Sequence, residues 1–124
     1  MTRLPFEVFV IVRRGSAYLI LHRTPRDGAY WHGVAGALEE GESFAQAARR
    51  ELEEETGLVA EPSEISEPYA YLLGEEPGDG IVVRPFLVDA PPGWEPTLNG
   101  EHDAYRWCSR DEALELLHLS LIHI

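Results

Sequence analysis

Three glutamates near the middle of the chain have the spacing of a shared ligand set. Glu51, Glu54 and Glu55 stand at positions i, i+3 and i+4, so on an α-helix their carboxylates would share one face. Like charges at this spacing repel, and carboxylates in the last turn of a helix oppose its dipole. An arrangement that costs local stability in this way tends to mark a functional site.

The three carboxylates favour a particular kind of cation. Oxygen ligands in a strongly negative cluster suit Mg²⁺ or Mn²⁺, and the lack of a Cys/His ligand set argues against zinc. A divalent cation would also offset the repulsion between the glutamates. The alternative is an exposed acidic helix without a ligand, which gives no reason for the fixed polar positions on either side of the cluster.

The helix that would position these glutamates has clear ends. Ser43 is a good N-cap residue, and Gly57 stands where a glycine would end the helix. Between them lie about 13 residues with neither Pro nor Gly. An apolar stripe lies about a quarter turn from the glutamates, at about 100° per residue, and consists of Ala45, Ala48 and Leu52. We therefore expect one side of the helix to dock on a sheet, with the acidic cluster at its edge.

A longer pattern contains the three glutamates. From Gly36 to Leu58 the chain reads G-x5-E-x7-R-E-U-x-E-E-x-G-U, where U is an aliphatic residue. This segment resembles the Nudix box, the signature of the Nudix hydrolases, and every specified position matches. The resemblance implies an α+β fold, an α/β/α sandwich with a mixed β-sheet between helices. It also implies hydrolysis of a nucleoside diphosphate linked to another moiety by attack of water on phosphorus.

The resemblance assigns metal ligands residue by residue. Glu51, Glu54 and Glu55 resemble the ligands of Mg²⁺ or Mn²⁺, with Glu42 joining directly or through water. The family also uses the backbone carbonyl of the residue at position 35. This chain has Ala35 there, within Val-Ala-Gly instead of the more common Pro-Gly-Gly.

The implied catalytic set extends beyond metal binding. Arg50 resembles the family arginine that orients a neighbouring glutamate, here Glu51, by bidentate geometry that Lys lacks; a plain salt bridge within the helix is the alternative. A glutamate would complete proton removal from the attacking water. Family members draw this base either from the box helix, which here carries Glu51 and Glu54, or from a distal loop. Glu101 is the distal candidate, and a solvated loop carboxylate is its alternative reading.

Two residues outside the box are candidates for substrate binding. Arg23 ends a predicted strand beside the site entrance and is placed to pair with phosphate, with a surface ion pair as the alternative. Trp31 is a candidate for stacking on a base or pterin, although aromatic residues beside a core more often serve packing. His32 and His102 are expected to be structural or solvated. The segment around Trp31, together with Glu101-His102, resembles the branch that hydrolyses dihydroneopterin triphosphate or dATP.

Two other functions are kept as alternatives. One is hydrolysis of ADP-ribose or of a dinucleoside polyphosphate, for which clear additional signatures are not found. The other is a non-catalytic Nudix module that senses a nucleotide, but such modules usually lose carboxylates of the box. Members of the family are often dimers, so a homodimer is an assembly that the resemblance suggests and the sequence does not test.

Composition limits the partners and the compartment. The 124 residues carry a net charge of −12, and all ten basic residues are Arg. Such a surface repels duplex nucleic acid, which is bound largely through phosphate neutralisation, whereas a small phosphate substrate is accessible through bound cations. The single cysteine, Cys108, allows no internal disulfide and fits a reducing compartment. The apolar run 6–12 is too short to span a membrane, so a cytoplasmic protein is expected.

Hydrophobic alternation and turn residues predict the elements around the box. Strands are expected over 7–13, 17–23, a short stretch before Gly36, 58–60, 68–73, 81–88 and 104–108, the fifth and sixth of these forming a hairpin. Ser109 and Glu112 have the spacing of a capping box that opens a final helix. Hairpins in place of regular βαβ repeats favour a mixed sheet between helices.

The chain is expected to form a single domain over residues 1–118. The last six residues, 119–124, read Leu-Ser-Leu-Ile-His-Ile and match one reading frame of an adaptor sequence used in DNA library preparation. We therefore expect this segment to be a non-native tail. Long-read sequencing of the source locus tests that expectation, since the same six codons followed by a stop would contradict it.

Overall fold

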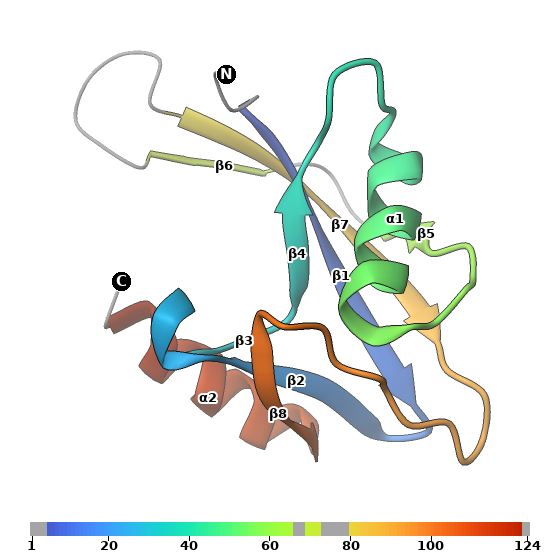
Figure 1. The fold of residues 1–124 in the computed structure, drawn as a ribbon, viewed down its shortest axis with the longest axis vertical. Coiled ribbons are helices and arrows are strands. Elements are labelled where there is room, and N and C mark those ends of the chain that lie inside the picture. Colours follow the sequence, from blue (N-terminus) through green and yellow to red (C-terminus); the bar gives the residue numbers. More distant parts are fainter. Residues whose placement is uncertain (1–4, 66–68, 73–79, 123–124) are drawn as a thin grey trace.

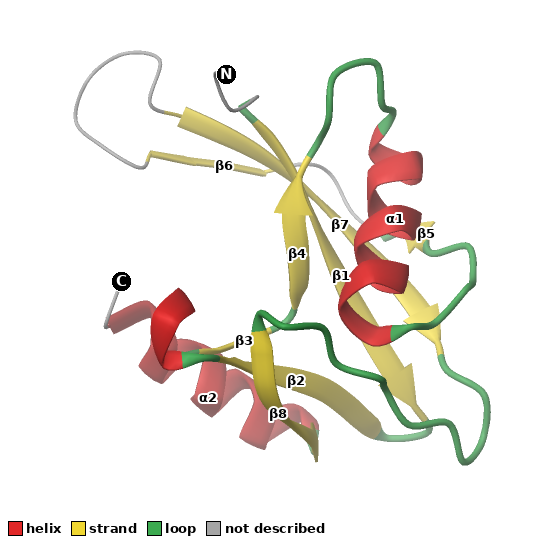
Figure 2. Cartoon of the chain, in the orientation of Figure 1, coloured by secondary structure: helices red, strands yellow, loops and turns green. Residues whose placement is uncertain are grey.

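The computed structural model describes residues 5–65, 69–72 and 80–122. Within these residues a sheet of eight strands is flanked by two long helices (Figures 1 and 2). The elements in chain order are β1 Phe6–Arg14, β2 Ala17–Arg23, the 3-10 helix η1 Pro25–Asp27, β3 Trp31–His32, β4 Val34–Ala37, α1 Phe44–Thr56, β5 Ser63–Glu64, β6 Tyr69–Leu72, β7 Gly80–Asp89, β8 His102–Cys108 and α2 Arg110–Ile122.

The sheet is mixed, as the hairpin pattern predicts. β1 pairs in parallel with β7, while its other neighbours, β2 and β4, run antiparallel to it. β2 in turn pairs with both β3 and β8, and β6 pairs with β7 from Tyr69↔Val83 to Leu72↔Gly80. The predicted hairpin is therefore confirmed for these two strands. Its connection, 73–79, and the ends of the predicted strand, Pro68 and Leu73, lie outside the described residues.

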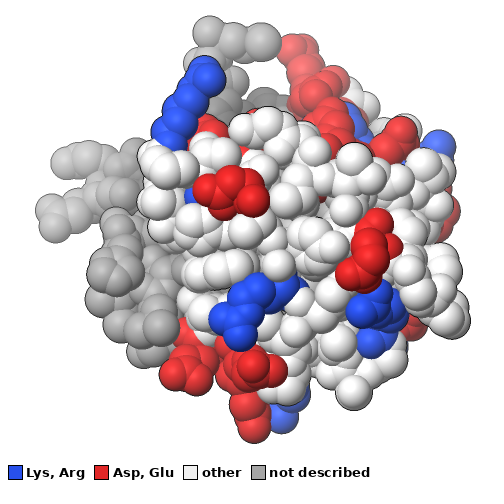
Figure 3. Space-filling model, turned by 60° about the horizontal axis from the view of Figure 1, so that its bottom comes forward, with Lys and Arg blue, Asp and Glu red and all other residues white. Residues whose placement is uncertain are grey.

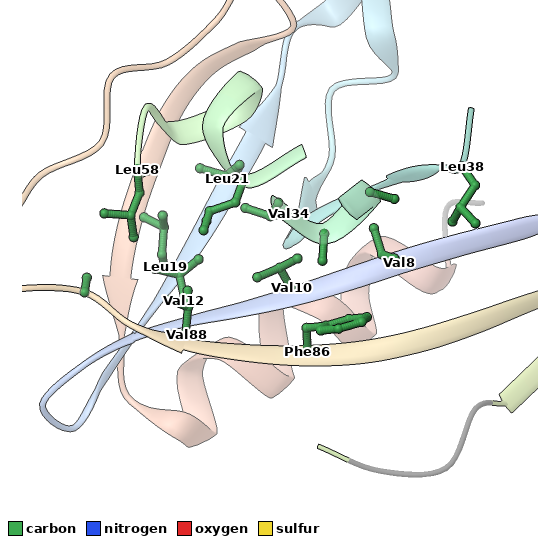
Figure 4. Packing of buried hydrophobic residues seen from close by; sticks show 14 residues of the cluster. Val8, Val10, Val12, Leu19, Leu21, Val34, Leu38, Leu58, Phe86 and Val88 are labelled. Atoms are coloured by element: carbon green, nitrogen blue, oxygen red, sulfur yellow. The ribbon is translucent and has the colours of Figure 1, made fainter. Parts of the chain in front are cut away.

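The two helices cover opposite faces of the sheet. On one face, alternate residues of β1 pack in a single buried cluster with Ala47, Ala48 and Leu52 of α1 (Figure 4). On the other face, Ile20 and Cys108 pack against Ala113 of α2. This arrangement confirms the α/β/α sandwich. The members of the first cluster labelled in Figure 4 are Val8, Val10, Val12, Leu19, Leu21, Val34, Leu38, Leu58, Phe86 and Val88.

Both predicted helix starts are confirmed by their capping bonds. At α1, the Ser43 hydroxyl accepts a hydrogen bond from the Gln46 amide at 3.1 Å, and the Gln46 side chain accepts one from the Ser43 amide at 2.8 Å. At α2, Ser109 and Glu112 make the same reciprocal pair. α1 ends at Gly57, which adopts a left-handed φ of 81° and donates to the Glu53 carbonyl.

Two local predictions are wrong. Ala45 is exposed and Ala47 is buried in its place, because the buried face of α1 is rotated toward Glu55, which itself faces the sheet. Residues 58–60 are not a strand; the short strand is β5, further along the chain. After α1 the backbone is held by the helix end, since the Leu58 amide donates to the Thr56 hydroxyl at 3.2 Å.

Charge on the molecular surface is dispersed where it is visible. On the face in Figure 3, Arg side chains and Asp or Glu side chains lie in separate small groups among uncharged residues. Within the described part of this face no continuous basic patch is seen. The absence of a duplex nucleic acid partner stays a prediction from the net charge of −12. Among the helices of the described residues, none is both long and apolar enough to cross a membrane.

Candidate functional site

Arg50 connects three glutamates of the box, Glu42, Glu51 and Glu54. Its Nε and Nη2 donate to the two carboxylate oxygens of Glu42 at 2.7 and 3.0 Å, a bidentate pair. Its Nη1 donates to Glu51 at 2.8 Å and to Glu54 at 3.2 Å. Nη2 also donates to the carbonyl of Ala37 at 3.0 Å. One guanidinium therefore fixes α1, the loop before it and the end of β4 relative to one another.

The electrostatics of Arg50 follow from these bonds. The bonds to Glu42 and Glu51 raise the pKa of Arg50 above its already high value. The same pairing lowers the pKa of Glu42. Both groups are therefore charged at neutral pH, and the Arg50 fork holds Glu51 in one orientation.

Glu51 lies against the backbone of β4 at Gly36. A Cβ added at Gly36 would lie 2.7 Å from Oε2 of Glu51 and closer still to its Cδ and Oε1. Only glycine leaves this space for the carboxylate. This contact explains why the box needs a glycine fifteen positions before the glutamate.

Glu55 is the most buried carboxylate of the cluster, with the residue 3% exposed. Burial, followed by the hydrogen bond and charge of Glu51 and by the charge of Glu101, raises the pKa of Glu55 to about 10; a backbone hydrogen bond from Ala35 opposes the rise. Its Oε2 is buried without a hydrogen-bond partner. A buried carboxylate oxygen in that state is costly, and a cation would satisfy it.

Glu101 reaches the cluster from the segment between β7 and β8. In Figure 1 this segment passes along the C-terminal end of α1, and the amide of Thr97 donates to the carbonyl of Thr56 at 2.8 Å. The carbonyl of Glu101 accepts from the Thr24 amide at 3.0 Å, and its own amide donates to Asn99 Oδ1 at 3.1 Å. The backbone of Glu101 is thereby tied to two other segments while its side chain is exposed.

The remaining box glutamates differ in exposure. The side chain of Glu54 is 53% exposed and that of Glu42 is 13% exposed. A polar groove of about 760 Å³ passes along this side of α1 and is lined in part by Glu42, Arg50 and Glu54. Glu51 lies against Gly36 of β4 and Glu55 is buried, whereas Glu54 faces solvent at the margin of the same cluster.

Two histidines that the sequence analysis set aside lie beside Glu55. His32 of β3 and His102 of β8 bring their Nε2 atoms to 2.7 Å, with the rings stacked at an angle of 18°. Oε1 of Glu55 lies 3.7 Å from Nε2 of His102, whose side chain is fully buried. Burial lowers the pKa of His32 to about 3 and also lowers that of His102, with the charge of Arg23 contributing to both. In the sequence, His32 lies next to Gly33 and His102 next to Glu101, and these neighbours were the signal that could have indicated a role for the two histidines.

The two substrate-binding candidates lie in different surroundings. The charge of Arg23 acts on both His32 and His102, and its Nε donates to the carbonyl of Asp27 at 2.9 Å. Trp31 packs against the cluster under α2, because successive side chains of a strand point to opposite faces. That packing gives Trp31 a structural role, and its contact with a substrate stays a prediction.

The donor set fits a divalent cation that prefers oxygen ligands. The charges of Glu51 and of Glu101 both act on Glu55, which also accepts a backbone hydrogen bond from Ala35, and Glu54 stands at the margin. The unpartnered oxygen of Glu55 and the space kept open by Gly36 support the same conclusion. Carboxylate clusters of this kind suit Mg²⁺ or Mn²⁺.

Comparison with known proteins identifies the family. A NUDIX domain model matches residues 3–123. The chain is 41% identical over 114 residues to an octanoyltransferase of Myxococcus xanthus, covering 90% of this chain and 32% of that protein. It is 36% identical over 116 residues to an NAD-capped RNA hydrolase of Haemophilus influenzae, covering 87% of this chain and 40% of that protein.

The fold has a solved counterpart. The E. coli dihydroneopterin triphosphate pyrophosphohydrolase superposes with a TM-score of 0.80 at 24% identity, over 94% of this chain and 88% of that one. At this identity the likeness concerns the fold alone. This chain belongs to the Nudix hydrolase family, as the box predicts. It spans less than half the length of the two curated relatives.

Proposed function

We propose that this chain is a Mg²⁺- or Mn²⁺-dependent pyrophosphohydrolase. Its substrate would be a nucleoside or pterin triphosphate, or another compound of a nucleoside diphosphate linked to a second moiety. The proposal rests above all on one observation: the buried carboxylate of Glu55 has an oxygen without a hydrogen-bond partner, and the charges of Glu51 on the same helix and of Glu101 on a distant loop both act on it. A hydrophobic core does not require carboxylates from a helix and a distant loop to lie close together, so this arrangement points to a bound ligand.

Metal binding is assigned to the box and its neighbours. Glu51, Glu54 and Glu55 would hold the cation, with the backbone carbonyl of Ala35 and with Glu42 directly or through water. When bound, such a cation polarises phosphoryl oxygens, lowers the pKa of water and stabilises the leaving group.

The protein's own groups orient this set and handle the proton. Arg50 acts as a positioning residue, because it holds Glu51 through one bond and Glu42 through two. Glu101, exposed on a loop with a fixed backbone, is the proposed base that takes the proton from the attacking water. Glu51 and Glu54 are the alternatives on the helix.

Arg23 is proposed to bind substrate phosphate. Its charge acts on both histidines beside Glu55, so it lies close to them. A guanidinium is suited to phosphate oxygens by its planar fork. Trp31 is the proposed aromatic contact to the base or pterin, although part of its side chain packs in the cluster under α2.

The first candidate substrate class comes from the resemblance in sequence. The branch resemblance around Trp31 and Glu101 favours dihydroneopterin triphosphate or dATP. The relative described as an NAD-capped RNA hydrolase supports a dinucleotide-like substrate as the second candidate. A nucleotide-sensing module without activity is the third candidate.

A substrate panel tests the proposal. Release of phosphate and pyrophosphate is measured for nucleoside triphosphates, dihydroneopterin triphosphate, ADP-ribose and dinucleoside polyphosphates, each with Mg²⁺ and with EDTA. We expect metal-dependent turnover of one class, with triphosphates releasing pyrophosphate. Binding of a nucleotide without turnover of any compound by the folded protein would favour the sensing module instead.

A further inference from the structure

We propose that His32, Glu55 and His102 form a second cation site, adjoining the carboxylate cluster, that takes Zn²⁺ or another first-row transition metal ion. The three side chains come from β3, α1 and β8, and they meet in the interior between the sheet and α1. One ligand atom from each lies within 4.8 Å of the other two. The proposal concerns metal binding and does not depend on the proposed hydrolase activity.

The separations between the ligand atoms suit a small metal ion. With metal–ligand bonds of about 2.0–2.1 Å, two ligands of a tetrahedral ion lie about 3.3 Å apart. The two Nε2 atoms are 2.7 Å apart, and Nε2 of His102 is 3.7 Å from Oε1 of Glu55. These two values lie on either side of the required separation, and the third pair, His32 and Glu55, lies within 4.8 Å, so side-chain rotations would bring the three ligand atoms onto one ion.

A hydrogen bond behind His102 orients its ring for metal binding. Oδ1 of Asn99 lies 3.1 Å from Nδ1 of His102 and also accepts from the amide of Glu101 at 3.1 Å. The Glu101 bond fixes Oδ1 as the acceptor, so Nδ1 of His102 carries the proton. The lone pair of Nε2 then points toward His32 and Glu55. Metal-binding histidines typically donate their other N–H to an oxygen in this way.

The buried carboxylate of Glu55 is the second observation. Glu55 is 3% exposed, and its Oε2 has no hydrogen-bond partner. The ring of His102 is fully buried beside it. A cation would satisfy the carboxylate and replace the proton shared by the two imidazoles, so the cost of burying these groups together would be offset.

The ligand types select the metal. Two imidazole nitrogens and one carboxylate oxygen suit Zn²⁺, Co²⁺ or Fe²⁺, whereas Mg²⁺ prefers oxygen ligands and water. His32 is only partly buried, which leaves one side of the site open to water or substrate. Because Glu55 also belongs to the carboxylate cluster, the two sites would share one ligand.

The test measures metal binding directly on the whole chain. Protein freed of metal with EDTA and then of EDTA is titrated with Co²⁺ and Zn²⁺ by calorimetry, and Co²⁺ binding is also followed by visible absorption. The variants are His32→Gln and His102→Gln, with His22→Gln as the matched control, since His22 pairs with Asp103 on β8. Circular dichroism and Tm establish that each variant folds.

The three histidine variants are expected to differ in their affinity for Co²⁺ and Zn²⁺. His32→Gln and His102→Gln should each weaken Co²⁺ and Zn²⁺ binding by at least about 100-fold and abolish the visible Co²⁺ band, as loss of a ligand costs more than the 10–100-fold of an outer contact. His22→Gln should bind as the unaltered chain does, and Mg²⁺ affinity should be retained in His32→Gln. Equal Co²⁺ affinity in the unaltered chain and His32→Gln would overturn the proposal. If His102→Gln does not fold, His32→Gln alone decides.

Discussion

The carboxylate of Glu51 fills the space beside Gly36 that a side chain would otherwise occupy. A Cβ at position 36 would lie 2.7 Å from Oε2 of Glu51 and closer to two other atoms of the carboxylate. Gly36 is backbone of β4, paired with Val8 of β1, so it cannot move away without disturbing the sheet. The position of Glu51 thus depends on a glycine in a different element.

Gly36→Ala should therefore displace Glu51 and reduce hydrolysis. A shift of about 1 Å in a catalytic group costs on the order of 100-fold in rate, and we expect kcat to fall by about that factor while far-UV circular dichroism is retained. Gly100→Ala is the control, because its Cβ would meet no atom within 4 Å. Near-normal kcat in Gly36→Ala would contradict the assigned role of Glu51.

Glu54→Gln removes a proposed metal ligand with little change of shape. Because charge stabilisation by a bound cation would be lost, kcat should fall by at least about 100-fold. The fold should be intact, since Glu54 is 53% exposed. Glu53→Gln, an exposed neighbour on the same helix, provides the matched control in steady-state kinetics with Mg²⁺, and similar rates for the two variants would remove Glu54 from the site.

The Arg50 fork should not be replaceable by Lys. Arg50 donates to Glu42, Glu51 and Glu54 from three different nitrogens, and one ammonium cannot reproduce that planar geometry. We expect Arg50→Lys to lower the free energy of unfolding by about 1–2 kcal/mol and to reduce kcat.

Chemical denaturation with Arg49→Lys as control tests this expectation. Arg49 makes an exposed ion pair with Glu61, and its substitution should change stability by less than about 0.5 kcal/mol. If both lysine variants are equally stable and active, the positioning role of Arg50 is wrong.

The buried Glu55 predicts a pH dependence of the metal-free protein. Its pKa is about 10 in the folded chain, against an ordinary value of 4.5, so the folded state favours the protonated form. This contribution to stability is fully present below about pH 4.5 and is lost as the pH rises toward 10. Glu55→Gln keeps a neutral side chain and should remove this part of the dependence.

Urea unfolding in EDTA at several pH values measures the effect. The free energy of unfolding of the unaltered chain, minus that of Glu55→Gln, should decrease steadily with rising pH. A difference that is constant with pH would show that Glu55 is ionised in the folded protein.

Features that depend on neighbours along the chain are the ones best predicted from the sequence. Ser43, Gly57 and the box glutamates lie within one helix, so their spacing alone places them. The burial of Glu55 was not predicted, because a small rotation of the helix about its axis changes which side chains face the sheet. The exposure of Ala45 shows that rotation.

The histidine pair depends on long-range strand register. His32 pairs with Leu21, and His102 pairs with Arg23 on the other side of β2. A register shift between His22 and Arg23 adjusts the second pairing, and no local pattern in the sequence reports it. Periodicity within each strand therefore identifies the strands but not the convergence of the two rings.

Hydrolysis by the unaltered chain and by Glu51→Gln, each with Mg²⁺ and with EDTA, tests the central claim most directly. Pyrophosphate and phosphate release are followed over the substrate panel, with Glu53→Gln as the control and circular dichroism as the check on folding. We predict Mg²⁺-dependent turnover of one substrate class by the unaltered chain and Glu53→Gln, and a loss of at least about 100-fold in Glu51→Gln. Turnover that is unaffected by EDTA, or that Glu51→Gln retains in full, would contradict a metal-dependent site built on this helix.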